Sequence, residues 1–194
     1  MTPLILASTS SYRKELLARL KIPFTQISPV FEEIPAEGED SLAMVARFAI
    51  GKARSVLENL DEPALIIGSD QVALLGDQVL NKPLTHEKAI QQLSQCSGRT
   101  VCFHTALCLL NGTSQEVQSS VDEYRIHFRR FSTSQIDSYL RKETPYDCAG
   151  SIRAEGLGIA LIAGMSGNDY TSLIGLPLLS LLEMMRKEGI EPLD

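Results

Sequence analysis

The sequence predicts an α/β protein built on a mixed sheet. Short apolar runs typical of buried strands alternate with segments whose apolar residues recur at helical spacing. Two connections read as hairpin turns, Gly76-Asp77 and Asn111-Gly112, whereas other connections are long enough to be crossovers. Because hairpins join antiparallel strands and crossovers join parallel ones, both kinds of pairing are expected in one protein.

The first part of the chain contains alternating strands and helices. An apolar run that ends in four hydroxyl residues precedes the first helix, and an acidic loop with Pro and Gly precedes the second. The expected strands are residues 3–7, 24–31 and 64–75, the expected helices are residues 12–20 and 41–60, and the acidic loop is residues 32–40.

The second part of the chain adds hairpins and shorter helices. Thr85 caps one expected helix and Gly98 ends it, and Asn111-Gly112 separates two alternating strands. The expected strands are residues 78–80, 100–110, 115–128 and 157–163, and the expected helices are residues 85–97, 134–142 and 178–187.

Composition excludes several classes of protein. The 194 residues include 18 basic and 24 acidic side chains, a net charge of −6, which argues against a nucleic-acid partner. The four cysteines form no C-x-x-C pair and no metal-type spacing with the three histidines, which indicates reduced thiols. The sequence shows neither a signal-like start nor an apolar run near the roughly 18 residues of a membrane helix. We therefore expect a soluble, cytoplasmic protein with no membrane partner.

The first turn of the first helix carries the wrong charge for a helix start. Arg13 and Lys14 stand where acidic residues are favoured. No capping box offsets their charge, because Lys14 occupies the position three residues after Ser11 where a capping box has Glu or Gln. Cations at this end are explained by a bound anion, and phosphate is the usual occupant of a strand-to-helix turn. The alternative is a solvated pair, because the dipole term is only about 0.3–1 kcal/mol.

Asp70 interrupts a strongly apolar strand. A carboxylate in such a strand is costly to bury unless it has a cation, a metal or a water to activate. Gly68, two residues earlier, permits close backbone approach beside a ligand. The alternative is an aspartate at a strand end that accepts hydrogen bonds from turn amides.

Lys52 is directed toward the core side of its helix. With about 100° per residue, Lys52 falls at about 340° from Val45, beside the apolar stripe, whereas Arg47 and Arg54 fall near 200° and 180°. The alternative is a lysine whose stem covers the core while its ammonium group reaches water.

Two further charged positions complete the candidate set. Lys82 follows the Gly76-Asp77 hairpin, which turns the chain back toward Asp70, and Pro83 biases Lys82 to an extended backbone. Glu33 lies in the acidic loop, next to Glu32. Carboxylates near phosphate-binding cations suggest a hard divalent metal, and the alternative is a solvated acidic loop.

These segments resemble, in order and over nearly the whole chain, the Maf family of nucleoside triphosphate pyrophosphatases. Each motif is weak alone, but the ordered set is specific, and no Walker loop or G-x-S-x-G elbow competes with it. The matching segments are residues 6–10 with Arg13, Glu33, Lys52-Ala53, residues 68–71, residues 82–84, Gly98, residues 148–151, Glu155-Gly156 and residues 175–177.

The resemblance implies a fold and an activity. The fold would be an elongated, two-lobed Maf/ITPase-like α/β fold with a central cleft, formed by one domain over residues 1–194. The reaction would be hydrolysis between the α- and β-phosphates of a nucleotide, and the family suggests a homodimer. Asp70 becomes the proton acceptor, Glu33 and Asp70 candidate ligands of Mg²⁺ or Mn²⁺, and the candidate phosphate ligands are Ser8, Ser10, Arg13, Lys52 and Lys82.

Departures from the family pattern narrow the expected substrate. Many members of the family are similar to enzymes acting on dTTP and UTP. They carry Ser-Pro-Arg-Arg at the first turn of the first helix, a Thr after the catalytic Asp and a Gln in the later motif. At these three places this chain has Tyr12, Gln71 and Glu155. This trio is similar to the branch that hydrolyses 7-methyl-GTP. The methylated guanine is a cation, which an aromatic face attracts by about 0.5–2 kcal/mol, and a carboxylate accepts both of its adjacent N–H donors. The alternative for Tyr12 is a packing aromatic.

Two other functions remain open at this point. One is a pyrophosphatase for dTTP, UTP or modified pyrimidine nucleotides. The other is a non-catalytic nucleotide-binding regulator of cell division, against which the combination of Asp70, Lys52 and Lys82 argues, since pure binding needs no base.

Overall fold

The computed structural model describes residues 2–194, which form two compact units. The first unit contains the chain up to residue 71 together with residues 105–122 and 169–194, and the second contains residues 72–104 and 123–168. Strands β3 (Leu65–Leu75), β5 (Thr100–Asn111) and β6 (Val117–Phe128) contribute residues to both units.

A seven-stranded mixed sheet organises the chain, in the order β2-β1-β3-β5-β6-β7 with β4 paired to β3. Strand β1 pairs in parallel with both β2 and β3, whereas β3–β4 and β6–β7 are antiparallel pairs. The predicted α/β class with a mixed sheet is therefore confirmed. The remaining strands are β1 (Leu4–Ala7), β2 (Thr25–Ile27), β4 (Gln78–Val79) and β7 (Ile162–Gly167).

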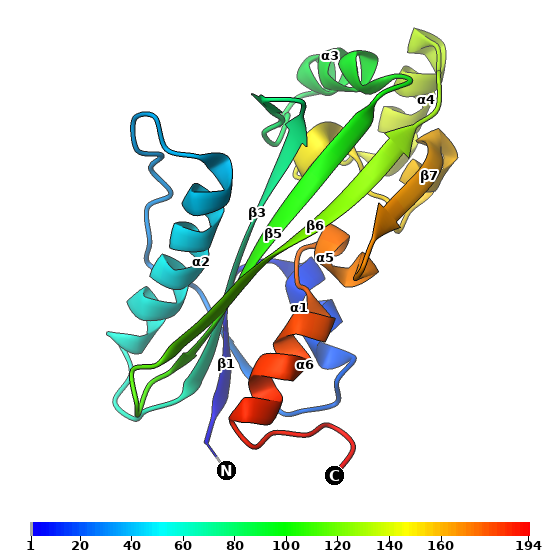
Figure 1. The fold of residues 1–194 in the computed structure, drawn as a ribbon. Coiled ribbons are helices and arrows are strands. Elements are labelled where there is room, and N and C mark those ends of the chain that lie inside the picture. Colours follow the sequence, from blue (N-terminus) through cyan, green and yellow to red (C-terminus); the bar gives the residue numbers. More distant parts are fainter. Residues whose placement is uncertain (1) are drawn as a thin grey trace. The chain divides into compact units, whose positions relative to one another are not determined.

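The first unit places helices on both faces of its strands (Figure 1). Helix α2 (Ser41–Leu57) lies on one side of β1 and β3, and α1 (Ser11–Ala18) and α6 (Leu178–Lys187) lie on the other. A short helix, α5 (Tyr170–Ile174), precedes α6.

Alternation along β1 and β3 decides which side chain meets which helix. Leu4, Leu6, Leu65 and Ile67 belong to one buried cluster with residues of α1 and α6. Because side chains alternate along a strand, Ile66, Gly68 and Asp70 of β3 face α2. Gly68 fits this face, since a Cβ added there would lie 2.0 Å from the carbonyl oxygen of Ala49 in α2.

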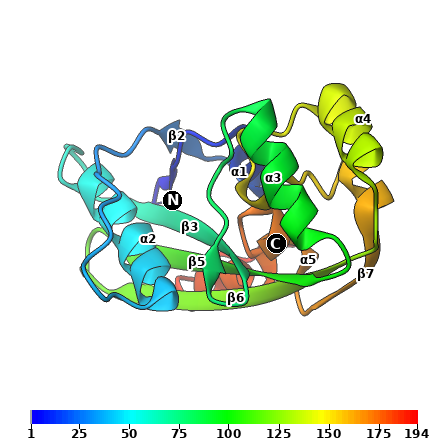
Figure 2. The same cartoon turned by 90° about the horizontal axis from the view of Figure 1, so that it is seen from above.

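The second unit contains α3 (His86–Cys96) and α4 (Thr133–Glu143), which lie side by side (Figure 2). Thr85 caps α3, as predicted, by accepting a hydrogen bond from the amide of Lys88. The β3–β4 hairpin also forms as predicted, and the amide of Leu80 donates to the carbonyl of Ala73.

One predicted strand is wrong. Of the expected strand 157–163, the first five residues form a 3₁₀ helix, Leu157–Leu161, and β7 begins only at Ile162. A short apolar run does not distinguish a strand from a helical turn by periodicity. Here the amide of Gly158 donates to the carbonyl of Arg153, and a Cβ at Gly158 would lie 2.3 Å from that oxygen, so the chain curls back on itself.

Smaller differences between the predicted and the observed elements concern the ends of helices and strands and a few short elements. Strand β2 covers only Thr25–Ile27 of the expected 24–31, and Ser10, not Ser11, caps α1. Helix α5 and a 3₁₀ turn, Ala149–Ser151, were not expected, because neither is long enough to show a periodic pattern.

The structure also bears on the predictions about membrane helices and about the cysteines. None of the helices in residues 2–194 has the length and apolar character needed to cross a membrane. The four cysteines are free thiols, and burial raises the pKa of Cys96 and of Cys108 to about 12.

Candidate active site

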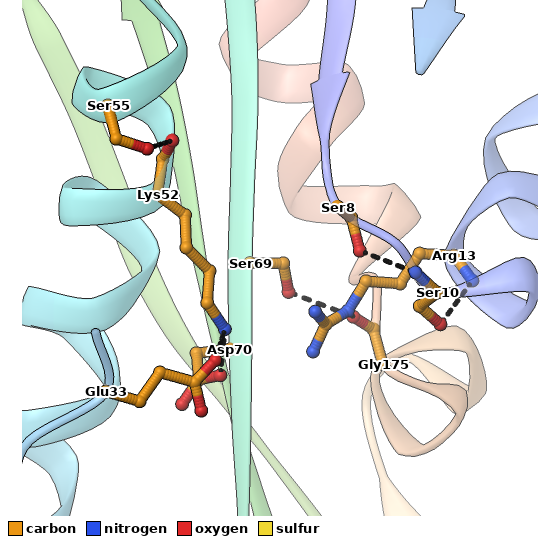
Figure 3. Close-up of polar contacts among 9 residues, drawn as sticks. All are labelled: Ser8, Ser10, Arg13, Glu33, Lys52, Ser55, Ser69, Asp70 and Gly175. Atoms are coloured by element: carbon orange, nitrogen blue, oxygen red, sulfur yellow. Dashed lines mark hydrogen bonds and ion pairs between the residues drawn. The ribbon is translucent and has the colours of Figure 1, made fainter. Parts of the chain in front are cut away.

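A buried ion pair joins α2 to β3. The ammonium nitrogen of Lys52 lies 2.6 Å from Oδ1 of Asp70, and the two side chains are 8% and 12% exposed (Figure 3). Helical spacing turns Lys52 toward the sheet, and strand alternation turns Asp70 toward α2. Asp70 lies inside the eleven-residue strand β3, so the alternative of a strand-end aspartate bound to turn amides is wrong.

A second carboxylate reaches the same ammonium group from the acidic loop. Oε1 of Glu33 lies 2.6 Å from the Lys52 nitrogen, and the Glu33 side chain is 52% exposed. Lys52 is thus held between two carboxylates, one buried and one open to solvent. This arrangement holds the two acids close together around one ammonium group.

Burial makes Asp70 a better proton acceptor than a surface aspartate. Desolvation raises the pKa of Asp70 above its ordinary value; the charges of Lys52 and Arg13 oppose the rise and the charge of Glu33 adds to it. A carboxylate with a raised pKa accepts a proton more readily near neutral pH, which is what a general base requires.

The turn between β1 and α1 presents hydroxyl groups. Oγ of Ser8 accepts from the amide of Ser10, and Oγ of Ser10 accepts from the amide of Arg13 (Figure 3). Both hydroxyls use their oxygens as acceptors, so their O–H groups can donate to an anion. The turn is braced by Gln26 of β2, whose amide nitrogen donates to the carbonyls of Ser8 and Ser10.

Arg13 is oriented by the connection between α5 and α6. Its Nε donates to the carbonyl of Gly175 at 2.8 Å, and the hydroxyl of Ser69 donates to the same oxygen at 2.9 Å (Figure 3). Burial lowers the pKa of Arg13, while the charges of Asp70 and Glu33 raise it. Within residues 2–194 no hydrogen bond engages Nη1 or Nη2, so these donors are available to an anion.

Gln71 points to the opposite side of β3 from Asp70. Its amide nitrogen lies within hydrogen-bond distance of Oγ1 of Thr105 and of the carbonyls of Ser172 and Leu173 in α5. These acceptors fix which end of the amide faces α5, and the other end, Oε1, is an acceptor.

The predicted residues divide between the two units. The first unit contains most of them, and the second contains Lys82, which is exposed beyond β4, and Glu155, whose Oε1 lies 3.4 Å from Nε of Arg153. Tyr12 is partly exposed in the first turn of α1. The predicted residues in the first unit are Ser8, Ser10, Tyr12, Arg13, Glu33, Lys52, Asp70 and Gln71.

Sequence reasoning missed several supporting residues. Gly175 accepts from Arg13 and from Ser69, and Thr105 accepts from Gln71, although none of these three supporting residues carries a charge that would indicate a role. Residues 175–177 are one of the segments that match the family, and this match is the sequence signal that points to Gly175.

Glu33 and Asp70 could together supply two carboxylate ligands to a divalent cation. No group of three or more His, Cys, Asp or Glu side chains suited to a metal occurs in residues 2–194. Glu33 and Asp70 each engage Lys52 through one oxygen, which leaves Oε2 and Oδ2 as hard donors. Mg²⁺ commonly takes one or two carboxylates and completes its shell with water and substrate phosphates, so this donor set fits such an ion.

Fold and site together define an α/β protein with an acid–lysine pair beside a strand-to-helix turn that presents hydroxyl and guanidinium donors. The chain belongs to the Maf-like protein family, whose model matches residues 3–188. It is 52% identical to a 7-methyl-GTP pyrophosphatase of Methylobacillus flagellatus over 98% of this chain and 99% of that protein. It is 50% identical to a 7-methyl-GTP pyrophosphatase of Nitrosococcus oceani over 96% of this chain and 93% of that protein.

A solved structure shows a more distant likeness. The nucleoside-triphosphatase / dITP/XTP pyrophosphatase of Mycobacterium abscessus aligns with 66% of this chain and 75% of its own chain, at 17% identity and a TM-score of 0.40. The assignment to the family does not depend on it.

Proposed function

We propose that this protein is a pyrophosphatase that hydrolyses 7-methyl-GTP to 7-methyl-GMP and pyrophosphate. The observation that carries the proposal is identity of about half the residues, over nearly full length, to relatives with that name. The pairing of Asp70 with Lys52 at 2.6 Å supports it, because catalysis needs a base where binding alone does not.

In the proposed reaction, water attacks the α-phosphorus in line with the departing pyrophosphate. Asp70 accepts the proton of that water as the new P–O bond forms. The bond between the α-phosphorus and the bridging oxygen breaks, and its electron pair leaves with pyrophosphate. Cationic and hydroxyl donors offset the charge of the triphosphate. The proposed donors are Ser8, Ser10, Arg13, Lys52 and Lys82.

A divalent cation, Mg²⁺ or Mn²⁺, is proposed as the cofactor. Glu33 and Asp70 would hold it through their carboxylate oxygens. When bound, the ion would neutralise phosphate charge in the way common to phosphoryl-transfer sites. Lys52 lies 2.6 Å from an oxygen of each carboxylate and so holds the two acids near one another.

Recognition of the base is assigned to Tyr12, Gln71 and Glu155. Tyr12 would stack on the cationic 7-methylguanine, and Glu155 would accept its N1–H and N2–H donors. The orientation of Gln71 supports a role as an acceptor, since its amide nitrogen is turned toward Thr105 and α5. An acceptor suits the donor edge of guanine.

Location and assembly follow from the same proposal. A free nucleotide substrate and four free thiols fit a cytoplasmic protein. A homodimer, and a substrate cleft formed by one domain over residues 1–194, remain predictions from the family.

A substrate panel tests the proposed function. Pyrophosphate release is measured with 7-methyl-GTP, GTP, dTTP and UTP in the presence of Mg²⁺ or Mn²⁺, with a chelator as control. The proposal expects the highest kcat/KM for 7-methyl-GTP. Preference for dTTP or UTP would favour the pyrimidine-nucleotide alternative, and binding without pyrophosphate release would favour the regulator.

A further inference from the structure

The loop that carries Glu33 has little packing of its own. Residues 32–38 are all exposed, so burial of apolar side chains does not fix this part of the acidic loop. Yet Oε1 of Glu33 lies 2.6 Å from the Lys52 nitrogen. A half-exposed carboxylate on an exposed loop needs other contacts to remain at one place, because ordering a loop costs about 1–2 kcal/mol per residue.

Arg47 of α2 supplies contacts on the C-terminal side of Glu33. Its Nε donates to Oε1 of Glu39 at 2.7 Å, and its Nη2 donates to the carbonyl of Ile34 at 3.0 Å and to Oε2 of Glu39. The guanidinium also lies 4.8 Å from the ring centroid of Phe48. One side chain therefore binds the loop at the residue directly after Glu33 and again five residues later.

Phe31 supplies the contact on the N-terminal side. Its ring packs edge-on against Phe48, with centroids 5.8 Å apart. It also lies directly over Gly51, where an added Cβ would be 2.2 Å from Cε2 of Phe31. Glu33 thus lies between two anchors on α2, the helix that also carries Lys52.

We propose that Arg47 is a positioning residue for the reaction. By binding Ile34 and Glu39 it holds the acidic loop against α2, and so holds the carboxylate of Glu33 beside Lys52 and Asp70. Phe31 on Gly51 completes the attachment. This inference rests on the proposed function, because it assigns Arg47 an effect on catalysis through Glu33.

A double-mutant cycle tests the proposal. The variants are Arg47→Ala, Glu33→Gln and the two combined, with kcat/KM for 7-methyl-GTP as the measurement. Each single change is expected to lower kcat/KM by about tenfold, a common effect of losing a group that supports a site residue. The combined variant is expected to equal Glu33→Gln alone, because Arg47 acts through Glu33.

Matched variants separate positioning from a general effect on the fold. Arg54→Ala removes another exposed arginine of α2 and is expected to leave kcat/KM unchanged. Arg47→Lys is expected to recover part of the loss. Amide hydrogen exchange in residues 32–39 is expected to quicken in Arg47→Ala and not in Arg54→Ala, while exchange in the β3 core stays as in the unmodified protein.

Each outcome separates this inference from the proposed function. Full activity of Arg47→Ala beside an impaired Glu33→Gln would overturn the role of Arg47 and leave the pyrophosphatase proposal standing. The same conclusion would follow if the losses of kcat/KM in the two single variants multiplied in the combined variant. Absence of pyrophosphate release from the unmodified protein would instead overturn the proposed function. Unchanged exchange in residues 32–39 would overturn the attachment of the loop by Arg47.

Discussion

The ammonium nitrogen of Lys52 lies 2.6 Å from Oδ1 of Asp70, and both side chains are nearly buried. The pair connects a helix to the middle of a strand, and each partner offsets the cost of burying the other. Because desolvation dominates, the pKa of Asp70 is raised even with this lysine beside it. The contact with Lys52 thus stabilises the buried carboxylate, whereas burial, not the lysine, raises its pKa.

Removing the lysine should destabilise the fold. Lys52→Met leaves Asp70 without its closest cation, so unfolding should become easier by about 3 kcal/mol. Urea unfolding checks this value. The combined variant Lys52→Met with Asp70→Asn should recover part of the lost stability, since no buried charge then lacks its partner, and should remain inactive. Unchanged stability of Lys52→Met would show that the pair contributes little.

Replacing Gly175 should disturb Arg13. Gly175 has a φ of +119°, and an added Cβ would lie 3.4 Å from Nε of Arg13. Gly175→Ala is expected to cost about 1–2 kcal/mol of stability from backbone strain and to lower kcat by shifting the guanidinium. Gly189→Ala is the matched control, because Gly189 also has a positive φ, +76°, and an added Cβ there would meet nothing within 4 Å. Equal kinetics for the two variants would count against the orientation of Arg13 by Gly175.

Acid should weaken the attachment of the acidic loop. The hydrogen bonds of Arg47 lower the pKa of Glu39 to about 2 from an ordinary value of 4.5. A carboxyl whose folded pKa is lowered contributes stability that is complete above its ordinary pKa and disappears as pH falls through the folded value. The stability difference between the unmodified protein and Glu39→Gln should therefore shrink between pH 4.5 and about 2. Chemical unfolding at several pH values measures it, and a constant difference would contradict the ion pair.

Exchanging the proposed base-reading residues should change selectivity. Tyr12→Arg places a cation where a cationic base would stack, and Glu155→Gln replaces an acceptor of two donors with an amide. The combined variant is expected to move the ratio of kcat/KM away from 7-methyl-GTP and toward UTP and dTTP. The substrate panel measures this ratio, and an unchanged preference would remove the assignment of these residues.

Short-range patterns singled out each member of the pair at the centre of the site, but separately. A period of about 3.6 residues placed Lys52 on the core side of α2, and an apolar strand around Asp70 indicated a partnered carboxylate. What the sequence could not show is the pairing of these two elements in space. The close approach of Gly68 to the carbonyl oxygen of Ala49, which identifies the face of β3 that meets α2, is a tertiary contact that no local pattern encodes.

The supporting contacts lay beyond sequence reasoning for a physical reason. Arg13 is bound by a backbone carbonyl 162 residues away, and a carbonyl has no side-chain identity that a pattern can reveal. Arg47 falls on the solvent side of its helix by angular spacing, which favours a solvated side chain over a functional one. Its role depends on the path of an irregular loop, and such paths follow no periodicity.

The most direct measurement compares pyrophosphate release from 7-methyl-GTP by the unmodified protein and by Asp70→Asn. The substitution keeps the size of the side chain, so the fold should persist, as far-ultraviolet circular dichroism and thermal unfolding would show. The account predicts rapid release by the unmodified protein and loss of nearly all turnover in the folded variant. A folded Asp70→Asn protein that releases pyrophosphate at a near-normal rate would contradict the assignment of Asp70 as the proton acceptor.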